Sequence, residues 1–216
     1  MVKDGYPWVL VPLVAGLLAG LTYLLWPAPA LLPLAGVFLL LTAFMAYFFR
    51  DPRRDVPAES GLVVSPADWR VTRVEKLSVG DARSPTVVSI FLSPFDVHVN
   101  RSPIAGTVVD VSYTKGRFTA ATSDNASLVN EQNALTIKGE QLTVVCKQIA
   151  GVLARRIVCW KRPGESLEQG ERFGLIKFGS RTDLVLPPEV EVVVGVGERV
   201  SGGVSVIGRY RIGERS

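Results

Sequence analysis

The stretch TVVSIFLSPFDVHVNRSPIAGTVVDV, residues 86–111, decides the class of the fold. It places two runs rich in β-branched and aromatic residues, Thr86–Leu92 and Gly106–Val111, on either side of a polar segment that contains His98. Side chains of these types suit a pleated, half-buried surface, whereas Ser, Pro, Asn and Gly mark turns. The stretch therefore predicts two strands joined by a polar connection.

The same pattern continues toward the C-terminus. After residue 50 the best short helix candidate is Ser123–Asn133, and no run has a long helical period. Two segments with similar turns, Ser102–Val108 and Gly197–Gly203, resemble the strand–turn signatures of biotinyl- and lipoyl-type barrel-sandwich domains. We therefore expect a mainly β, barrel-sandwich-like domain. Further strand-like runs lie at Gln141–Cys146, Arg156–Trp160, Gly174–Phe178 and Glu191–Val194.

The N-terminal part has a different composition. Residues 1–49 contain only two charged side chains, although the chain has 24 Lys and Arg and 20 Asp and Glu. The uncharged runs Trp8–Trp26 and Leu31–Phe49 would each form a helix of about 28 Å, close to the thickness of the hydrocarbon core. Pro27 and Pro29 separate them. The pattern predicts a two-helix transmembrane hairpin over residues 1–49 and excludes an all-soluble protein, a disordered chain and a multi-pass transporter.

A signal peptide cleaved near Ala30 is the competing interpretation of the first apolar run. It leaves the second run unexplained. Arg50, Arg53 and Arg54 follow that run directly, and such clusters stay cytoplasmic. We therefore expect a hairpin in the cell (inner) membrane, shallow insertion being a variant, with a linker at residues 50–60 and a cytoplasmic domain at residues 61–216.

Charge and cysteine content exclude further classes of protein. The net charge of +4 is too small to indicate nucleic-acid binding, but it suits work beside an anionic lipid surface. Cys146 and Cys159 form no C-x-x-C motif, and with a single histidine they do not predict a metal site. Free thiols and one disulfide both remain open.

Familiar catalytic motifs are missing. Gly195-Val196-Gly197 lacks the third glycine of a dinucleotide loop, and Gly179-Ser180 lacks the lysine of a phosphate loop. Three polar segments remain, at residues 65–69 (SPADW), 92–101 (LSPFDVHVNR) and 178–183 (FGSRTD). Taken singly, they are typical of a capped turn, a structural histidine and an ordinary turn.

In their order along the chain and in their amino-acid sequences, the three segments resemble those of the phosphatidylserine decarboxylase proenzymes, and in particular the compact, pyruvoyl-dependent prokaryotic members. That family carries an S-P-x-D segment, an L-S-P-x-D-x-H segment and a late G-S motif followed by a short β tail. The resemblance extends from about Gly61 to the C-terminus and includes Gln148–Gly151 and Ala154–Val158.

The resemblance implies self-cleavage between Gly179 and Ser180. The products are chains of residues 1–179 and 180–216, which stay together as a heterodimer. Ser180 is converted into a covalent pyruvoyl group, the only cofactor, which reacts with the serine amine of the lipid headgroup. The implied reaction is decarboxylation of phosphatidylserine to phosphatidylethanolamine and CO2.

The resemblance also implies roles for two further residues. His98 matches the histidine that acts as acid and base in decarboxylation, and Asp68 matches the aspartate that acts in self-cleavage. Longer members carry a second histidine for self-cleavage where this chain has Arg101. Either His98 serves both steps or self-cleavage depends on Asp68 without that histidine. Arg101 itself suits a lipid phosphate or a structural contact equally.

Two alternative functions stay open at this point. One is the decarboxylation of a serine headgroup on archaeal-type ether lipids, and the other is a non-enzymatic, membrane-tethered adaptor with a barrel-sandwich fold. The adaptor gives no reason for the combination of Asp68, His98 and Gly179-Ser180. A homo-oligomer is compatible with the sequence, and a nucleic-acid partner is not expected.

Overall fold

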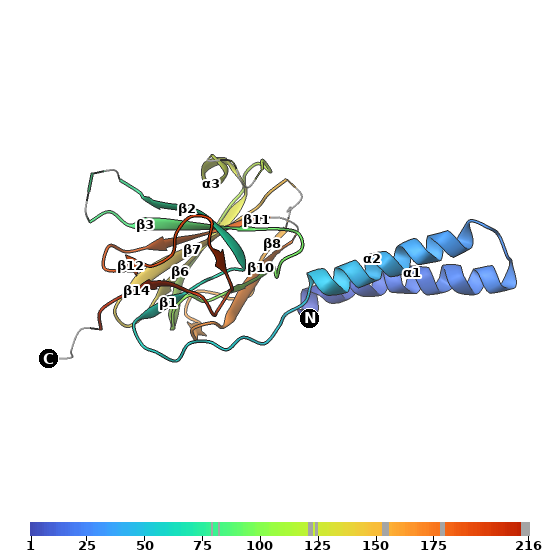
Figure 1. The fold of residues 1–216 in the computed structure, drawn as a ribbon, viewed down its shortest axis with the longest axis horizontal. Helices are drawn as coiled ribbons and strands as arrows, with labels where there is room; N and C mark the ends of the chain where they lie inside the picture. Colours follow the sequence, from blue (N-terminus) through green and yellow to red (C-terminus); the bar gives the residue numbers. More distant parts are fainter. Residues whose placement is uncertain are drawn as a thin grey trace. The chain divides into compact units, whose positions relative to one another are not determined.

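The chain divides into two compact units, Met1–Arg53 and Arg54–Ser216. The computed structural model describes residues 1–78, 80–81, 83–120, 123, 125–152, 156–177 and 180–212. The first unit is helical and the second is built mainly of strands (Figure 1).

The N-terminal unit consists of the short 3-10 helix η1 (Lys3–Gly5) and the helices α1 (Tyr6–Leu25) and α2 (Leu31–Phe48). The backbone N–H of Val2 donates to the carbonyl oxygen of Phe49 at 3.2 Å, so the two ends of the unit lie together. The helices also approach closely at Gly16, where an added Cβ would lie 3.2 Å from Cβ of Phe38. The expected two-helix hairpin is confirmed.

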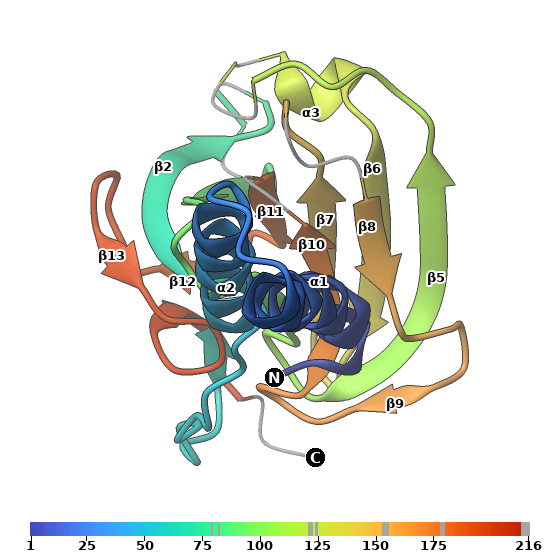
Figure 2. The same ribbon diagram turned by 90° about the vertical axis from the view of Figure 1, so that its right-hand side faces the viewer.

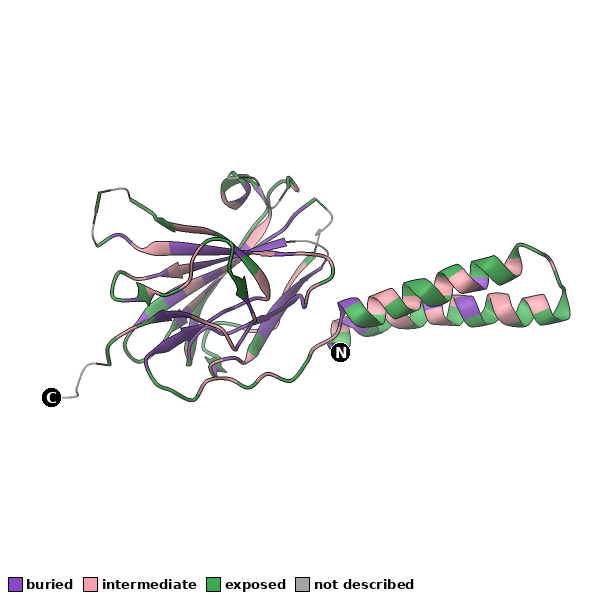
Figure 3. Cartoon of the chain, in the orientation of Figure 1, coloured by how far each residue is buried: buried purple, intermediate pink, exposed green. Residues whose placement is uncertain are grey.

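Both helices are long and apolar enough to cross a membrane, with a mean hydropathy of 2.1. Most of their leucines are exposed, and exposed residues are coloured green along both helices in Figure 3. The side chain of Thr22 donates to the carbonyl oxygen of Leu18 and that of Thr42 to Phe38, each at 2.8 Å, so neither hydroxyl needs water. An apolar surface of this size is unusual on a soluble protein and suits a lipid environment.

The second unit contains three antiparallel sheets within the described residues. An eight-stranded sheet has the order β13-β2-β3-β11-β7-β6-β5-β9, and two three-stranded sheets have the orders β1-β14-β12 and β4-β10-β8. The strands are β1 (Leu62–Val64), β2 (Trp69–Lys76), β3 (Thr86–Leu92), β4 (Val99–Arg101), β5 (Gly106–Thr114), β6 (Gln132–Lys138), β7 (Thr143–Ile149), β8 (Arg156–Cys159), β9 (Ser166–Leu167), β10 (Arg172–Lys177), β11 (Ser180–Leu186), β12 (Glu191–Val192), β13 (Arg199–Val200) and β14 (Val206–Arg209).

The large sheet is strongly curled, with β5, β6 and β7 side by side and β2 bending round the other edge (Figure 2). Its inward-facing side chains form a buried core with those of the smaller sheets, among them Ile90, Leu135, Leu184 and Ile207. In Figure 3 the buried residues of these strands are coloured purple. The expected mainly β, barrel-sandwich-like fold is therefore confirmed.

One local expectation is confirmed only in part. Among the described residues of the helix candidate Ser123–Asn133, the helix is the single turn α3 (Ala126–Val129), and the chain is already in β6 from Gln132 onward. In β6 buried and partly buried residues alternate along the strand, and Leu135 and Ile137 face the core. This period of two opposes a helix, so tertiary packing outweighs the helix propensity of the preceding residues.

The two cysteines are free thiols, which settles the alternative that the sequence leaves open. Cys146 lies in the core, and burial raises the pKa of its thiol. Burial also raises the pKa of Cys159, although the backbone of Lys161 and the side chain of Asn133 lower it in part. Neither thiol is therefore a reactive thiolate at neutral pH.

Candidate active site

Ser180 is the first residue of β11, a strand that pairs with both β3 and β7. It lies opposite Leu92 in the register with β3 and is fully buried. Its Oγ is buried and has no hydrogen-bond partner among the described residues. Ser89 in β3 also has a buried Oγ without a partner among the described residues, so Ser180 is distinguished by its position as the first residue of β11, directly after Gly179. Gly179, the other half of the expected cleavage site, lies outside the described residues.

The sheet topology brings the His98 segment to Ser180. β3 pairs with β11, and β4, the next strand along the chain, pairs with β10, the strand before β11. The end of β3 therefore lies beside the start of β11, where Leu92 is opposite Ser180, and the start of β4 lies beside the later part of β10, where Val99 is opposite Leu175. Residues 93–98 connect β3 to β4. Two of the three predicted segments are thus neighbours because of strand pairing alone.

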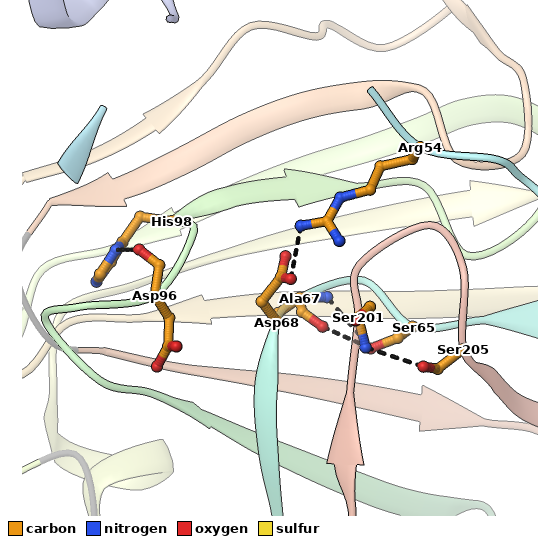
Figure 4. Close-up of polar contacts among 8 residues, drawn as sticks. All are labelled: Arg54, Ser65, Ala67, Asp68, Asp96, His98, Ser201 and Ser205. Carbon is orange, nitrogen blue, oxygen red and sulfur yellow. Dashed lines mark hydrogen bonds and ion pairs between the residues drawn. The ribbon is translucent and has the colours of Figure 1, made fainter. Parts of the chain in front are cut away.

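A compact turn positions His98. The Oδ2 atom of Asp96 accepts a hydrogen bond from the backbone N–H of Ser93 at 3.0 Å, and the backbone N–H of Asp96 donates to the Ser93 carbonyl oxygen at 2.9 Å. Nδ1 of His98 lies 2.9 Å from the Asp96 carbonyl oxygen (Figure 4). Because a carbonyl oxygen only accepts, Nδ1 carries the proton, and Nε2 is the basic nitrogen of the neutral ring.

Asp68 occupies a mostly buried position just before β2. Its Oδ1 lies 2.6 Å from Nη2 of Arg54, and both side chains are 14% exposed (Figure 4). Burial raises the pKa of the Asp68 carboxyl group above its usual value of 3.8, and the nearby charge of Asp96 adds to this effect. Arg54 and the backbone N–H of Gly202 act in the opposite direction without cancelling it. Asp68 is therefore a carboxylate with unusual proton affinity.

The backbone around Asp68 is closely fitted. Trp69, the next residue, has a φ of 108°, a left-handed conformation that is rare for a bulky side chain and costs about 1–3 kcal/mol. The guanidinium of Arg199 lies 4.2 Å from the centre of the Trp69 ring and covers it. At Gly202 an added Cβ would lie 3.1 Å from Oδ2 of Asp68, so glycine allows that backbone to approach the carboxylate.

Asn100 joins the three predicted segments. Its Nδ2 donates to the carbonyl oxygen of Pro66 at 3.3 Å and to Oγ1 of Thr182 at 3.0 Å. Pro66 belongs to the turn that carries Asp68, and Thr182 lies two residues after Ser180 on the same face of β11. A single buried side chain therefore fixes both segments to the strand that follows His98.

Two further buried amide side chains form a hydrogen-bonded chain with Asn100. Nε2 of Gln148 donates to Oδ1 of Asn100 at 2.9 Å, and Nδ2 of Asn133 donates to Oε1 of Gln148 at 3.1 Å. All three amides are at most 3% exposed. In a site of low dielectric such a chain is rigid when its members are satisfied, so it holds the β4 and β11 segments in one arrangement.

Arg101 is engaged within the domain. It is 8% exposed, and its Nη1 donates to the carbonyl oxygen of Gly170 at 3.0 Å. At Gly203 an added Cβ would lie 2.9 Å from Cδ of Arg101, so this glycine turn closes over the arginine stem.

The structure thus brings together the three segments that the sequence analysis selects, but it pairs their side chains in an unexpected way. The Asp68 carboxylate forms an ion pair with Arg54, whereas the His98 ring contacts the backbone of Asp96 (Figure 4). Sequence reasoning missed Arg54, Asn100 and Gln148 as parts of the site. The signal for Asn100 was its place two residues after His98; Arg54 was seen only as part of a basic cluster.

Comparison with known proteins identifies the family of the chain. The sequence pattern of the family described as phosphatidylserine decarboxylase matches residues 41–208. The phosphatidylserine decarboxylase proenzyme of Solibacter usitatus is 52% identical over 178 residues, covering 82% of this chain and 84% of that protein. The proenzyme of Geobacter sulfurreducens is 43% identical over 213 residues, 95% of this chain and 94% of its own. That of Symbiobacterium thermophilum is 46% identical over 214 residues, 96% and 94% of the two chains. The resemblance seen in the three segments is confirmed, and this chain belongs to the phosphatidylserine decarboxylase family.

Proposed function

We propose that this chain cleaves itself between Gly179 and Ser180 and then decarboxylates phosphatidylserine to phosphatidylethanolamine and CO2. The observation that carries the proposal is the Ser180 hydroxyl, which is buried and unpartnered among the described residues at the start of a central strand. The relatives are named proenzymes, which supports a chain that matures by cleavage. The proposed products are residues 1–179 and residues 180–216.

The proposed cleavage needs only the chain and one water molecule. Oγ of Ser180 attacks the carbonyl carbon of Gly179, and the amide is exchanged for an ester. A base then removes the Cα proton of Ser180, the ester oxygen leaves with Gly179 as the new C-terminal carboxyl group, and residue 180 becomes dehydroalanine. Water hydrolyses its enamine, ammonia leaves, and a pyruvoyl group remains at the start of the shorter chain.

We assign the proton transfer of self-cleavage to Asp68. Its turn is tied through Asn100 to Thr182, two residues after Ser180, so the turn that carries the carboxylate is held to the strand that begins with Ser180. A carboxylate of raised pKa is a stronger base than an exposed one, which suits removal of a weakly acidic Cα proton.

Residue 180 fits a pyruvoyl group. Its side-chain oxygen has no hydrogen bond to lose among the described residues, and its position on β11 is fixed by pairing with β3 and β7. When present, the pyruvoyl group supplies a ketone that reacts with the serine amine and takes up the electrons released with CO2. His98 then serves as the acid and base, since its Nδ1 is held by Asp96 and its Nε2 is the basic nitrogen of the neutral ring.

The two apolar helices suit this substrate because a lipid presents its headgroup at the membrane plane. We assign the domain to the cytoplasmic side of the cell (inner) membrane, on the ground that Arg50, Arg53 and Arg54 follow α2.

Intact mass spectrometry of the purified chain tests the proposal. Cleavage yields a fragment of about 4 kDa, lighter by about 17 Da than the sequence of residues 180–216 because serine nitrogen leaves as ammonia. Ser180→Ala leaves a single chain of 23.4 kDa without decarboxylase activity. Ser89→Ala is the matched control, since Ser89 is also fully buried with an unpartnered Oγ but lies within β3. Its cleavage and activity stay at the level of the unchanged chain.

The alternatives give different outcomes. An uncleaved wild-type chain without activity on phosphatidylserine would indicate the membrane-tethered adaptor. If the Ser180→Ala variant is cleaved, the hydroxyl of Ser180 is not the nucleophile of self-cleavage. Activity on a serine headgroup carried by ether-linked tails, with none on ester-linked tails, would identify the ether-lipid enzyme.

A further inference from the structure

Arg54 links the segment that follows the hairpin to the proposed self-cleavage site. It is the first residue of the second compact unit and lies six residues beyond the end of α2. Its Nη2 reaches Oδ1 of Asp68 at 2.6 Å, and its side chain is 14% exposed. Its neighbour Arg53 is exposed instead. Two adjacent arginines of one basic cluster thus have different environments.

The segment after Arg54 is held on the β domain, so the ion pair is not a loose surface contact. Val56 packs against Gly170, where even a Cβ would collide with the valine side chain. Glu59 forms an ion pair with Arg209 at 3.2 Å, and the carbonyl oxygen of Gly61 accepts from the backbone N–H of Tyr210 at 2.9 Å. These contacts fix the path of the chain and therefore the direction from which Arg54 approaches Asp68.

The charges near Asp68 explain why an arginine is needed there. Burial and the carboxylate of Asp96 both favour the protonated form of Asp68. On the other side stand the guanidinium of Arg54 and the backbone N–H of Gly202, and Arg54 is the stronger of these two. Arg54 contacts Oδ1 of Asp68, whereas Oδ2 is buried and faces the backbone of Gly202. The ion pair with Arg54 therefore occupies one oxygen and leaves the second oxygen outside it.

We propose that Arg54 is a positioning residue for self-cleavage: its guanidinium holds Asp68 by one oxygen as a carboxylate, leaving the other oxygen to accept the Cα proton of Ser180. The proposal rests on the function proposed for Asp68 above. It makes maturation depend on a residue of the membrane-proximal segment, so the proenzyme cleaves only when that segment is docked on the domain.

The sign of the electrostatic effect gives a distinctive test. Replacing Arg54 by a neutral side chain removes the cation that opposes burial, so the pKa of Asp68 rises further. Fewer molecules then carry the carboxylate at neutral pH, and self-cleavage slows. Raising the pH restores the carboxylate, so the loss is recovered in alkaline buffer. A purely structural role for Arg54 gives a loss that does not depend on pH in this way.

The experiment follows the cleavage of the full chain after cell-free synthesis in the presence of lipid vesicles, with buffers from about pH 6 to pH 9. Arg54→Gln is expected to slow formation of the 180–216 fragment by about tenfold at neutral pH and to move the rate profile to higher pH. Arg54→Lys keeps a cation and recovers part of the rate. Arg53→Gln is the matched control and cleaves like the unchanged chain.

Each other outcome overturns a defined part of the argument. If Asp68→Asn cleaves normally, the role proposed for Asp68 is wrong, whatever Arg54 does. If Asp68→Asn blocks cleavage while Arg54→Gln keeps the original rate and profile, only the inference on Arg54 fails. Equal slowing by Arg53→Gln and Arg54→Gln assigns the effect to general charge, and slowing of Arg54→Gln by the same factor at every pH assigns it to structure; both reject the inference.

Discussion

At the scale of single residues, Asn100 is the side chain on which the arrangement of the site depends. It donates to Pro66 and Thr182 and accepts from Gln148, all in the interior. Asn100→Ala leaves these partners unsatisfied, and we expect the free energy of unfolding to fall by about 2–3 kcal/mol. Chemical denaturation measures it in chains that also carry Ser180→Ala, so that all of them are expected to be uncleaved.

Gln141→Ala is the control for Asn100→Ala, because it removes an exposed amide. Its effect is expected to stay within about 0.5 kcal/mol. Equal stabilities for the two variants would show that the buried amide chain does not hold the segments together.

Asp68 predicts a pH dependence of stability. Its pKa is raised in the folded chain, so the folded state binds the proton more tightly than the unfolded state does. The stabilisation is therefore present in full below the unfolded value and is lost as the pH rises through the folded value. We compare two chains that both carry Ser180→Ala, one with Asp68→Asn and one that keeps Asp68. The free energy of unfolding of the Asp68→Asn chain, relative to that of the other, should increase from about pH 3 to pH 7. A relative stability that decreases over this range would contradict the raised pKa.

The sequence predicts the site only in part, and the reason is the distance along the chain between partners. Asp68, His98 and Ser180 each belong to a short motif that can be recognised from neighbouring residues in the sequence. Arg54 and Asp68 are 14 residues apart, whereas Asn100 and Thr182 are 82 apart. Such pairs meet only through strand register and loop path, which local patterns do not encode.

At the scale of elements, predicted strands were most accurate where apolar residues run together. Thr86–Leu92 coincides with β3, which is buried on both sides by β2 and β11 pairing and by the core. β2 was missed because its sequence, WRVTRVEK, contains four charged residues and the strand is mostly not buried. β6 was missed because its first residues were included in a helix candidate. Strands that are partly exposed to solvent thus have a weaker sequence signal for a strand than buried ones.

The strand order predicts that the two chains stay together after cleavage. Three strands of the proposed shorter chain pair with strands of the longer one: β11 with β3 and β7, β13 with β2, and β14 with β1. The shorter chain therefore forms part of the same sheets as the longer one. Its buried Leu184, Leu186 and Ile207 each stabilise the association by about 1.5–3 kcal/mol. We expect the two chains to co-elute in size-exclusion chromatography and to separate only in denaturant.

A matched pair of substitutions tests this association. Leu184→Ala removes a fully buried side chain and should lower the denaturant concentration at which the fragment is released, whereas Val196→Ala, at a 65% exposed position, should leave it unchanged. Release of the fragment in native buffer would contradict the pairing.

At the scale of the whole molecule, the division at Arg53 and Arg54 separates two physical problems. The first unit exposes apolar side chains and contains Lys3 and Asp4 as its charged residues before Arg50, whereas the second buries its apolar residues in one core. The surface of the first unit suits a lipid environment. Among the described residues the second unit has its own sheets and its own buried core, so removal of the hairpin should leave the β domain folded.

Deletion of residues 1–49 therefore separates membrane binding from maturation. The shortened chain keeps Arg54 and should cleave at the rate of the full chain, but it should no longer sediment with phosphatidylserine vesicles at physiological salt. Its activity on lipid in vesicles should fall, while activity on a soluble short-chain phosphatidylserine should persist, because the loss lies in access to the bilayer. Deletion of residues 1–54 is the contrasting variant: it removes Arg54 as well and should slow cleavage. Sedimentation of the 1–49 deletion with vesicles at the level of the full chain would place the membrane-binding surface on the β domain instead.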